Sequence, residues 1–281
     1  MDSLDQITGL YFELSNPDRL KILGSLKKAP RRLTELSEQV GVTHQQCVRH
    51  LKRLTDIHLV ERNGDGLYRL SSYGVLVHQL TPGLGFVTDH TEYFNQHTLT
   101  GVPVEFISRI GELSQSTLFD NVMEALSEIE TIVKHSEKKL NVIINKRTHS
   151  LRPSVAKAVR RGVHIKSISI TSYTPNFDVK REVNRRDEED IIEAERQETV
   201  QVADQTDFPV YLYQSEKAAF IAFPLHDASF DYTGFYTKDS NAVKFCSDLF
   251  DYYWSQTNII PTHELVDRHT KYVNLLDEKG N

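Results

Sequence analysis

Long polar side chains gather on one predicted helix near the start of the chain, residues 43–57. Its sequence, THQQCVRHLKRLTDI, places amide, imidazole and guanidinium groups on the turns that face away from the apolar positions Cys47, Leu51 and Leu54. In the major groove of DNA, Gln pairs well with adenine, and Arg pairs with guanine or binds phosphate. We therefore expect this helix to contact DNA through Thr43, His44, Gln45, Gln46, Arg49, His50 and Arg53.

A β-hairpin is predicted directly after this helix. Residues 60–71 alternate in polarity around Asn63-Gly64-Asp65-Gly66, and Asn-Gly and Asp-Gly pairs favour a tight turn between two strands. Arg62 and Arg69 flank the turn, and we expect them to contact phosphate groups.

Three helices are predicted ahead of the polar helix. Residues 4–14 have apolar positions at helical spacing, and Asn16 with Pro17 is a favoured start for a second helix. A third, short helix follows Thr34 and ends at Gly41, and Arg31, Arg32 and Thr34 at its start are further candidates for phosphate contact. The order helix, helix, short helix, turn, helix, hairpin is typical of a winged helix-turn-helix. A solvated helix face is the ordinary alternative for such polar residues, and the hairpin and the preceding helix favour the DNA contact.

The rest of the chain alternates predicted strands and helices, which is typical of an α/β domain. We expect a helix from residue 73 that Pro82 interrupts, a helical segment at 86–94, a boundary at Gly101-Val102-Pro103, and helices over 105–140. Residues 178–197 are highly charged and predict an exposed helix. The remaining predicted strands are 140–144, 163–171, 199–203, 210–213, 218–224 and 232–235, and the remaining predicted helices are 154–161 and 241–257. The predicted organisation is a DNA-binding domain (1–72), a helical linker or dimerisation segment (73–103), an α/β sensor or dimerisation domain (104–258) and a polar tail (259–281).

Two families resemble parts of the chain. Residues 5–72 resemble the winged helix-turn-helix of ArsR-like transcription factors. The matching residues are NPDRLKILGSLKKAPRRLTELSEQVGVTHQQCVRHLKRLTDIHLVER, with the family's helix cap at Thr43 and its His-Leu pair at His50-Leu51. That family usually has Gly where His58 stands, and a left-handed backbone costs more for His, so we expect this helix to end differently. Residues 104–258 resemble the middle domain of archaeal methanogenesis-regulatory factors, on VPVEFISRIGELSQSTLFDNVMEALSEIETIVKHSEKKLNVI, VAKAVRRGVHIKSISI and AVKFCSDLFDYYW. This second resemblance implies a sensor domain like that of TrmB-like regulators, with a phospholipase-D-like fold.

Composition limits the classes of function. The first 80 residues carry 11 Lys and Arg against 9 Asp and Glu, whereas residues 81–281 carry 22 against 30, a net charge of −8. Only the N-terminal part therefore suits contact with phosphate. The longest apolar run, residues 218–225, is too short to span a membrane, and two cysteines are too few for a disulfide framework. We expect a cytoplasmic protein whose Cys47 and Cys246 are small buried groups.

Metal and enzyme sites have weak support in the sequence. Asp89, His90 and His97, like His263, Glu264 and His269, lack the spacing of a metal site, so no metal and no cofactor is expected. The phospholipase-D pattern H-x-K-x-x-x-x-D begins at His164-Ile165-Lys166 but has Thr171 in the place of its Asp, so we expect no enzymatic activity. The less favoured alternatives are a protein-interaction scaffold that uses the winged helix for pairing, and a phosphodiesterase.

The expected function is thus DNA-binding transcriptional regulation by a homodimer. One recognition helix covers only half of a two-fold DNA site, and residues 4–14 and 73–94 are the expected pairing elements. Hydroxyl groups on the predicted strand 163–171 and at its exit are expected to orient a small polar effector, or else to bond within a dimerisation domain. These candidate effector residues are Ser167, Ser169, Thr171 and Tyr173.

Overall fold

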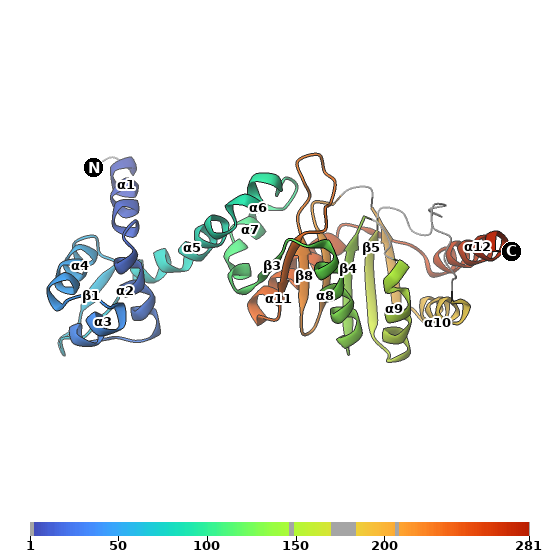
Figure 1. The fold of residues 1–281 in the computed structure, drawn as a ribbon, viewed down its shortest axis with the longest axis horizontal. Coiled ribbons are helices and arrows are strands. Elements are labelled where there is room, and N and C mark those ends of the chain that lie inside the picture. The colour runs from blue at the N-terminus through green and yellow to red at the C-terminus, as the bar shows by residue number, and fades with distance from the viewer. Residues whose placement is uncertain (1–2, 146–148, 170–183, 206–207, 281) are drawn as a thin grey trace. The chain divides into compact units, whose positions relative to one another are not determined.

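The computed structural model describes residues 3–145, 149–169, 184–205 and 208–280. It divides into two compact units, which we call unit 1 (residues 1–85) and unit 2 (residues 86–281). Helix α5 (Ser72–Asp89) runs across this division, which falls inside the predicted linker segment 73–103 (Figure 1).

Unit 1 has the predicted order of elements. Its helices are α1 (Ser3–Leu14), α2 (Pro17–Lys28), α3 (Leu33–Val40) and α4 (His44–Asp56), followed by the strands β1 (Val60–Arg62) and β2 (Tyr68–Leu70). The two strands pair antiparallel with Glu61 opposite Arg69. The core of the unit includes the fully buried side chains Ile22, Leu36, Cys47, Leu54 and Leu59. These elements confirm the α+β winged helix-turn-helix architecture.

Local hydrogen bonds explain where two of these helices begin. The side chain of Asn16 accepts a hydrogen bond from the backbone N–H of Arg19, which caps α2 as predicted. Helix α3 begins two residues earlier than predicted, because the Glu35 carboxylate accepts the backbone N–H of Arg32 at 2.8 Å, which makes Arg32 the N-cap in place of Thr34.

The end of α4 corrects the expectation for His58. Its φ is +64°, so His58 adopts the left-handed backbone in spite of its side chain. The backbone N–H of His58 donates to the Thr55 carbonyl at 2.9 Å, and its own carbonyl accepts the Ser71 hydroxyl. These bonds hold the ending that usually requires Gly, and they offset the cost of placing His there.

Helix α5 also differs from the prediction, since it continues through Pro82 without interruption. Proline removes one backbone donor, but its φ fits a helix. Val77 is buried in the core of unit 1 and Phe86 in the core of unit 2, so each half of the helix is anchored on its own side of Pro82. Beyond α5, α6 (Thr91–Gln96) covers part of the expected helical segment 86–94.

Unit 2 is built on an eight-stranded mixed sheet with the order β10-β6-β5-β4-β7-β8-β9-β3. Neighbouring strands β6, β5 and β4 are parallel, and the other pairs are antiparallel. The strands are β3 (Thr117–Phe119), β4 (Lys139–Ile144), β5 (His164–Ser169), β6 (Val200–Asp204), β7 (Tyr211–Ser215), β8 (Ala219–Ala222), β9 (Gly234–Thr237) and β10 (Asn258–Ile259). The helices that follow α6 are α7 (Val104–Ile107), α8 (Val122–His135), α9 (Arg152–Arg160), α10 (Arg185–Arg196), α11 (Ser240–Trp254) and α12 (Thr262–Gly280), with the 3-10 helices η1 (Ile110–Gln115) and η2 (His149–Leu151).

Helices cover both faces of this sheet, which explains why nearly every residue of β4, β7 and β8 is buried. One core cluster joins the sheet to α8, α9, α10 and α12, and the other joins it to α11, α7 and η1. In β4, Val142 belongs to the first cluster and Ile143 to the second, as the alternation of side chains along a strand requires. Figure 1 shows α8 and α9 lying across the strands. The α/β class predicted for this region is confirmed.

Three predictions within unit 2 were wrong or incomplete. Leu118, expected on a helix, lies in β3, because residues 117–119 pair with β9. Helix α10, expected to be exposed, buries one face, since Glu188 and Glu195 are 4% and 1% exposed. The tail beyond Pro261, for which no structure was predicted, forms α12, whose Leu265 packs in the core.

Candidate nucleic-acid interface

Helix α4 is held by its cap and by its apolar face. The Thr43 hydroxyl accepts the backbone N–H of Gln46 at 3.2 Å, and the Gln46 side chain accepts the backbone N–H of Thr43 at 3.0 Å. This reciprocal capping box was not foreseen, although its Thr-x-x-Gln spacing is visible in the sequence. Cys47, Leu51 and Leu54 are buried beneath the helix, so its polar positions are divided between the flanks and the outward face.

Five of the exposed residues on α4 form what we call the outer stripe: His44, Gln45, Val48, Arg49 and Lys52. Within the residues that the structure describes, the side chains of Arg49 and Lys52 have no hydrogen-bond or ion-pair partner. Val48 is 44% exposed among these polar groups, and an apolar side chain there suits the methyl group of thymine. Sequence reasoning missed Val48 and Lys52, although both follow from the 3.6-residue period of the helix.

The other predicted residues of α4 form an inner stripe, Gln46, His50 and Arg53, which is engaged within the domain. Arg53 donates to both carboxylate oxygens of Glu13, at 2.6 to 3.1 Å, and its guanidinium lies 5.2 Å from the centre of the Phe12 ring. Its hydrogen bond holds the pKa of Glu13 below the usual value. His50 lies 3.8 Å from Asp18, with its side chain only 16% exposed.

The two predicted arginines of the hairpin have different partners. Arg69 forms an ion pair of 2.7 Å with Glu61 on the neighbouring strand, which neutralises its charge. Arg62 lies over the Tyr68 ring at 5.6 Å and is without a carboxylate partner in the described part of the chain. Arg31 forms two backbone hydrogen bonds with Tyr68, which join the start of the short helix to the hairpin. Of the two hairpin arginines, Arg62 is therefore the one whose guanidinium is available to bind an external anion.

The candidate effector residues lie in unit 2. Ser167 and Ser169 are both buried on β5, and Ser167 also lines a cavity, whereas Thr171 and Tyr173 lie outside the described residues. Among the described residues, no group of three His, Cys, Asp or Glu side chains could hold a metal ion, and no helix is long and apolar enough to cross a membrane. Cys47 and Cys246 are buried free thiols, as predicted.

The comparison with known families supports the helix-turn-helix assignment of unit 1. A family model described as a helix-turn-helix domain matches residues 14–63, which span α2, α3, α4 and β1. Unit 1 is a winged helix-turn-helix domain. No curated protein sequence matches this chain.

Solved structures include the relatives expected from the sequence, all of them distant. TrmBL2, an archaeal chromatin protein, is 14% identical over 87% of this chain and 94% of its own, with a TM-score of 0.41. The homodimeric winged helix-turn-helix domain of Mb0332 from Mycobacterium bovis, described as a possible ArsR-family regulator, is 26% identical over 34% of this chain and 90% of its own, with a TM-score of 0.28. The phospholipase D family member Nuc from Salmonella typhimurium is 9% identical over 48% of this chain and 90% of its own, with a TM-score of 0.32.

Proposed function

We propose that this chain is a DNA-binding transcriptional regulator that reads DNA with α4 and contacts phosphate with the hairpin. The observation that carries the proposal is the outer stripe of the winged helix-turn-helix, where Arg49 and Lys52 are exposed without a partner among the described residues. Arginines elsewhere in the chain are mostly paired with carboxylates. An uncompensated cationic helix on a domain of this type suits the major groove.

Within this proposal the two stripes of α4 have different roles. Gln45 and Arg49 are the candidates for contact with bases, and Lys52 and Arg62 for contact with phosphate. His50 and Arg53 position the helix against α2 and α1, where they lie beside Asp18 and Glu13, and Gln46 caps the helix through Thr43. Arg69 is a weaker candidate than Arg62, because DNA would have to compete with Glu61 for it.

We also propose that the regulator acts as a homodimer through α1 and α5. On α5, Leu76, Leu80 and Leu84 are 60%, 73% and 62% exposed, and with Tyr73 they form an apolar stripe with steps of three and four residues. That spacing is the seam of a pair of packed helices. Exposed leucines in such a row are unusual on a monomer and are explained by pairing.

Sedimentation of the full chain tests the dimer. At micromolar concentration we expect a dimer for the native chain and a monomer for Leu80→Lys, which should keep its fold because Leu80 is exposed. Leu275→Lys is the matched control, since this leucine is 40% exposed on α12. A native chain that sediments as a monomer would contradict the pairing.

Titration of a DNA duplex against salt tests the DNA-binding role itself. For a DNA reader, the logarithm of the binding constant falls linearly with the logarithm of the salt concentration, by about 0.9 for each phosphate contact. A scaffold that uses the winged helix for pairing would show no such slope.

Unit 2 is proposed to sense an effector that shifts the population of the DNA-competent dimer. The absence of enzymatic activity stays a prediction, and hydrolysis of a phosphodiester by the full chain would contradict it.

A further inference from the structure

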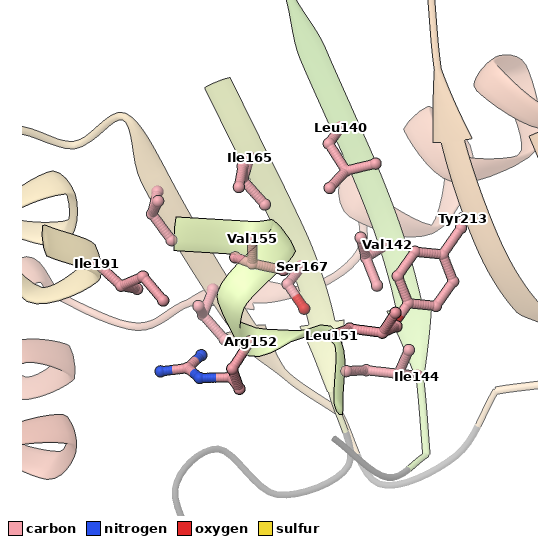
Figure 2. A pocket seen from close by; sticks show the side chains of 12 residues that line it. Leu140, Val142, Ile144, Leu151, Arg152, Val155, Ile165, Ser167, Ile191 and Tyr213 are labelled. Carbon is pink, nitrogen blue, oxygen red and sulfur yellow. The ribbon is translucent and has the colours of Figure 1, made fainter. Parts of the chain in front are cut away.

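Unit 2 contains a cavity of about 80 Å³ between the sheet and the helices α9 and α10. Strands β4, β5 and β6 supply one wall, and Leu151, Arg152 and Val155, with Ile191 on α10, supply the other (Figure 2). Of the twelve described residues that line it, nine have aliphatic side chains. The interior surface is therefore almost entirely apolar.

Three lining residues carry polar groups: Arg152, Tyr213 and, on β5, Ser167. Ser167 is 8% exposed, and its hydroxyl has no hydrogen-bond partner among the described residues. Figure 2 shows this hydroxyl directed into the space between the aliphatic side chains. This hydroxyl opens onto the cavity, so a molecule that bonds to it gains a hydrogen bond in addition to its apolar contacts.

The cavity has no charge to offer a ligand. Arg152 lies at its edge, but its guanidinium is directed away from Ser167 (Figure 2) and donates a hydrogen bond to the Glu188 carboxylate at 2.9 Å. The charge of Arg152 is thus already balanced by a carboxylate. A charged ligand would lose its hydration without gaining a counter-ion, so a neutral one is favoured.

Volume limits the size of the ligand. One ordered water needs roughly 10–15 Å³ of such space and two to four polar partners, which this apolar wall does not supply. A cavity of roughly 150 Å³ in another protein holds benzene, so a cavity of about 80 Å³ suits a smaller molecule. Sugars and nucleotides are excluded by size.

We propose that this cavity binds a small neutral molecule with a compact apolar body of about three to five carbon atoms and one hydroxyl or carbonyl group. The polar group bonds to the Ser167 hydroxyl, and the carbon atoms fill the space between the sheet and α9. The regulatory meaning of the site rests on the effector-sensing role proposed for unit 2. The ligand differs from the small polar effector expected from the sequence, because the walls around Ser167 are apolar.

Methyl NMR of the full chain tests the assignment with isobutanol as the probe. We expect saturable shifts in the millimolar range that are largest at the methyl groups of Val142, Val155 and Ile191, which line the cavity. Isobutyrate and isobutylammonium at the same concentrations should leave these signals in place. Ser167→Ala should weaken isobutanol binding about fivefold to tenfold, the usual value of one hydrogen bond, and Ser167→Val should abolish it by filling the space. Ser169→Ala on the same strand is the control and should bind as the native chain does.

Two results would overturn the proposal: no saturable shift in the native chain, or equal binding of isobutyrate. The native titration decides this even if Ser167→Val fails to fold. The effect of saturating isobutanol on DNA affinity is measured separately. An unchanged DNA affinity would refute the effector role while the methyl shifts still support the cavity site, and loss of all DNA binding in the native chain would refute the proposed function alone.

Discussion

Arg49 in unit 1 is used in a different way from the paired arginines of unit 2. In unit 2, Arg109, Arg160 and Arg268 each bind two carboxylates, and Arg152 binds Glu188. In unit 1, Arg49 stands on the exposed face of α4 without any such partner in the described part of the chain. The same residue type therefore stabilises a fold where it is paired and becomes available to an external anion where it is not.

The largest effect expected from this difference is on the stability of unit 2. Arg152→Met removes the guanidinium partner of Glu188, which is 4% exposed, and leaves it the His269 imidazole, so the loss should approach the cost of breaking a buried pair, about 3–5 kcal/mol. The free energy of unfolding in urea measures the loss. Arg196→Met is the control, because Arg196 and its partner Glu193 are both exposed, and it should change stability by less than about 0.5 kcal/mol. Equal effects of the two substitutions would contradict the role assigned to burial.

The second effect is sensitivity to acid. Burial opposes the charge of Glu188, but hydrogen bonds from His269 and Arg152 outweigh it and lower the pKa of Glu188 to about 2, from 4.5. A lowered pKa stabilises the fold fully above pH 4.5, and this stability is lost as the pH falls toward 2. The shift corresponds to about 3 kcal/mol. Unfolding measured between pH 6 and pH 2 should show this loss in the native chain and a smaller one in Glu188→Gln.

The third effect separates the two stripes of α4. Arg49→Ala should weaken specific DNA binding by about 1–3 kcal/mol if Arg49 contacts a base, and it should leave the melting temperature unchanged because Arg49 is exposed and unpaired among the described residues. Arg53→Ala should do the reverse: it should lower the melting temperature, since Glu13 then loses the hydrogen bonds from Arg53 and keeps only its ion pair with Arg19 among the described residues, and it should change DNA affinity less. A stronger loss of DNA affinity for Arg53→Ala would overturn the division into stripes.

The sequence was sufficient for the local features and insufficient for distant pairings. Thr43, Asn16 and the turn at Asn63-Gly64 are short-range signals, and the elements that they predict are present. The separation of Arg49 from Arg53 depends on Glu13, which lies 40 residues before Arg53 in the chain. The helical period of α4 cannot predict this pairing, because it relates only residues within the same helix.

Distant pairings explain the errors in unit 2 as well. The strand β3 forms because residues 117–119 pair with β9, which lies more than a hundred residues later in the chain. The acidic face of α10 is buried because His269 on α12 forms hydrogen bonds with both Glu188 and Glu195. The cavity beside Ser167 likewise depends on how α9 and α10 pack against the sheet. A charged stretch predicts an exposed helix only when no distant partner neutralises it.

The smallest expected effect concerns Lys52, which the sequence analysis passed over. Its ammonium is exposed on the outer stripe and has no carboxylate partner among the described residues, so on DNA we expect it to contact a phosphate. Lys52→Ala should therefore weaken binding about equally for all DNA sequences and reduce the salt slope by about 1, unlike Arg49→Ala, which should also relax sequence preference. Lys134→Ala is the matched control, because this exposed lysine of unit 2 pairs with Glu130 and should leave the slope as it is. If Lys52→Ala keeps the native slope while Lys134→Ala lowers it, then an unpaired cation does not mark the DNA-binding surface, and the comparison between the two units fails.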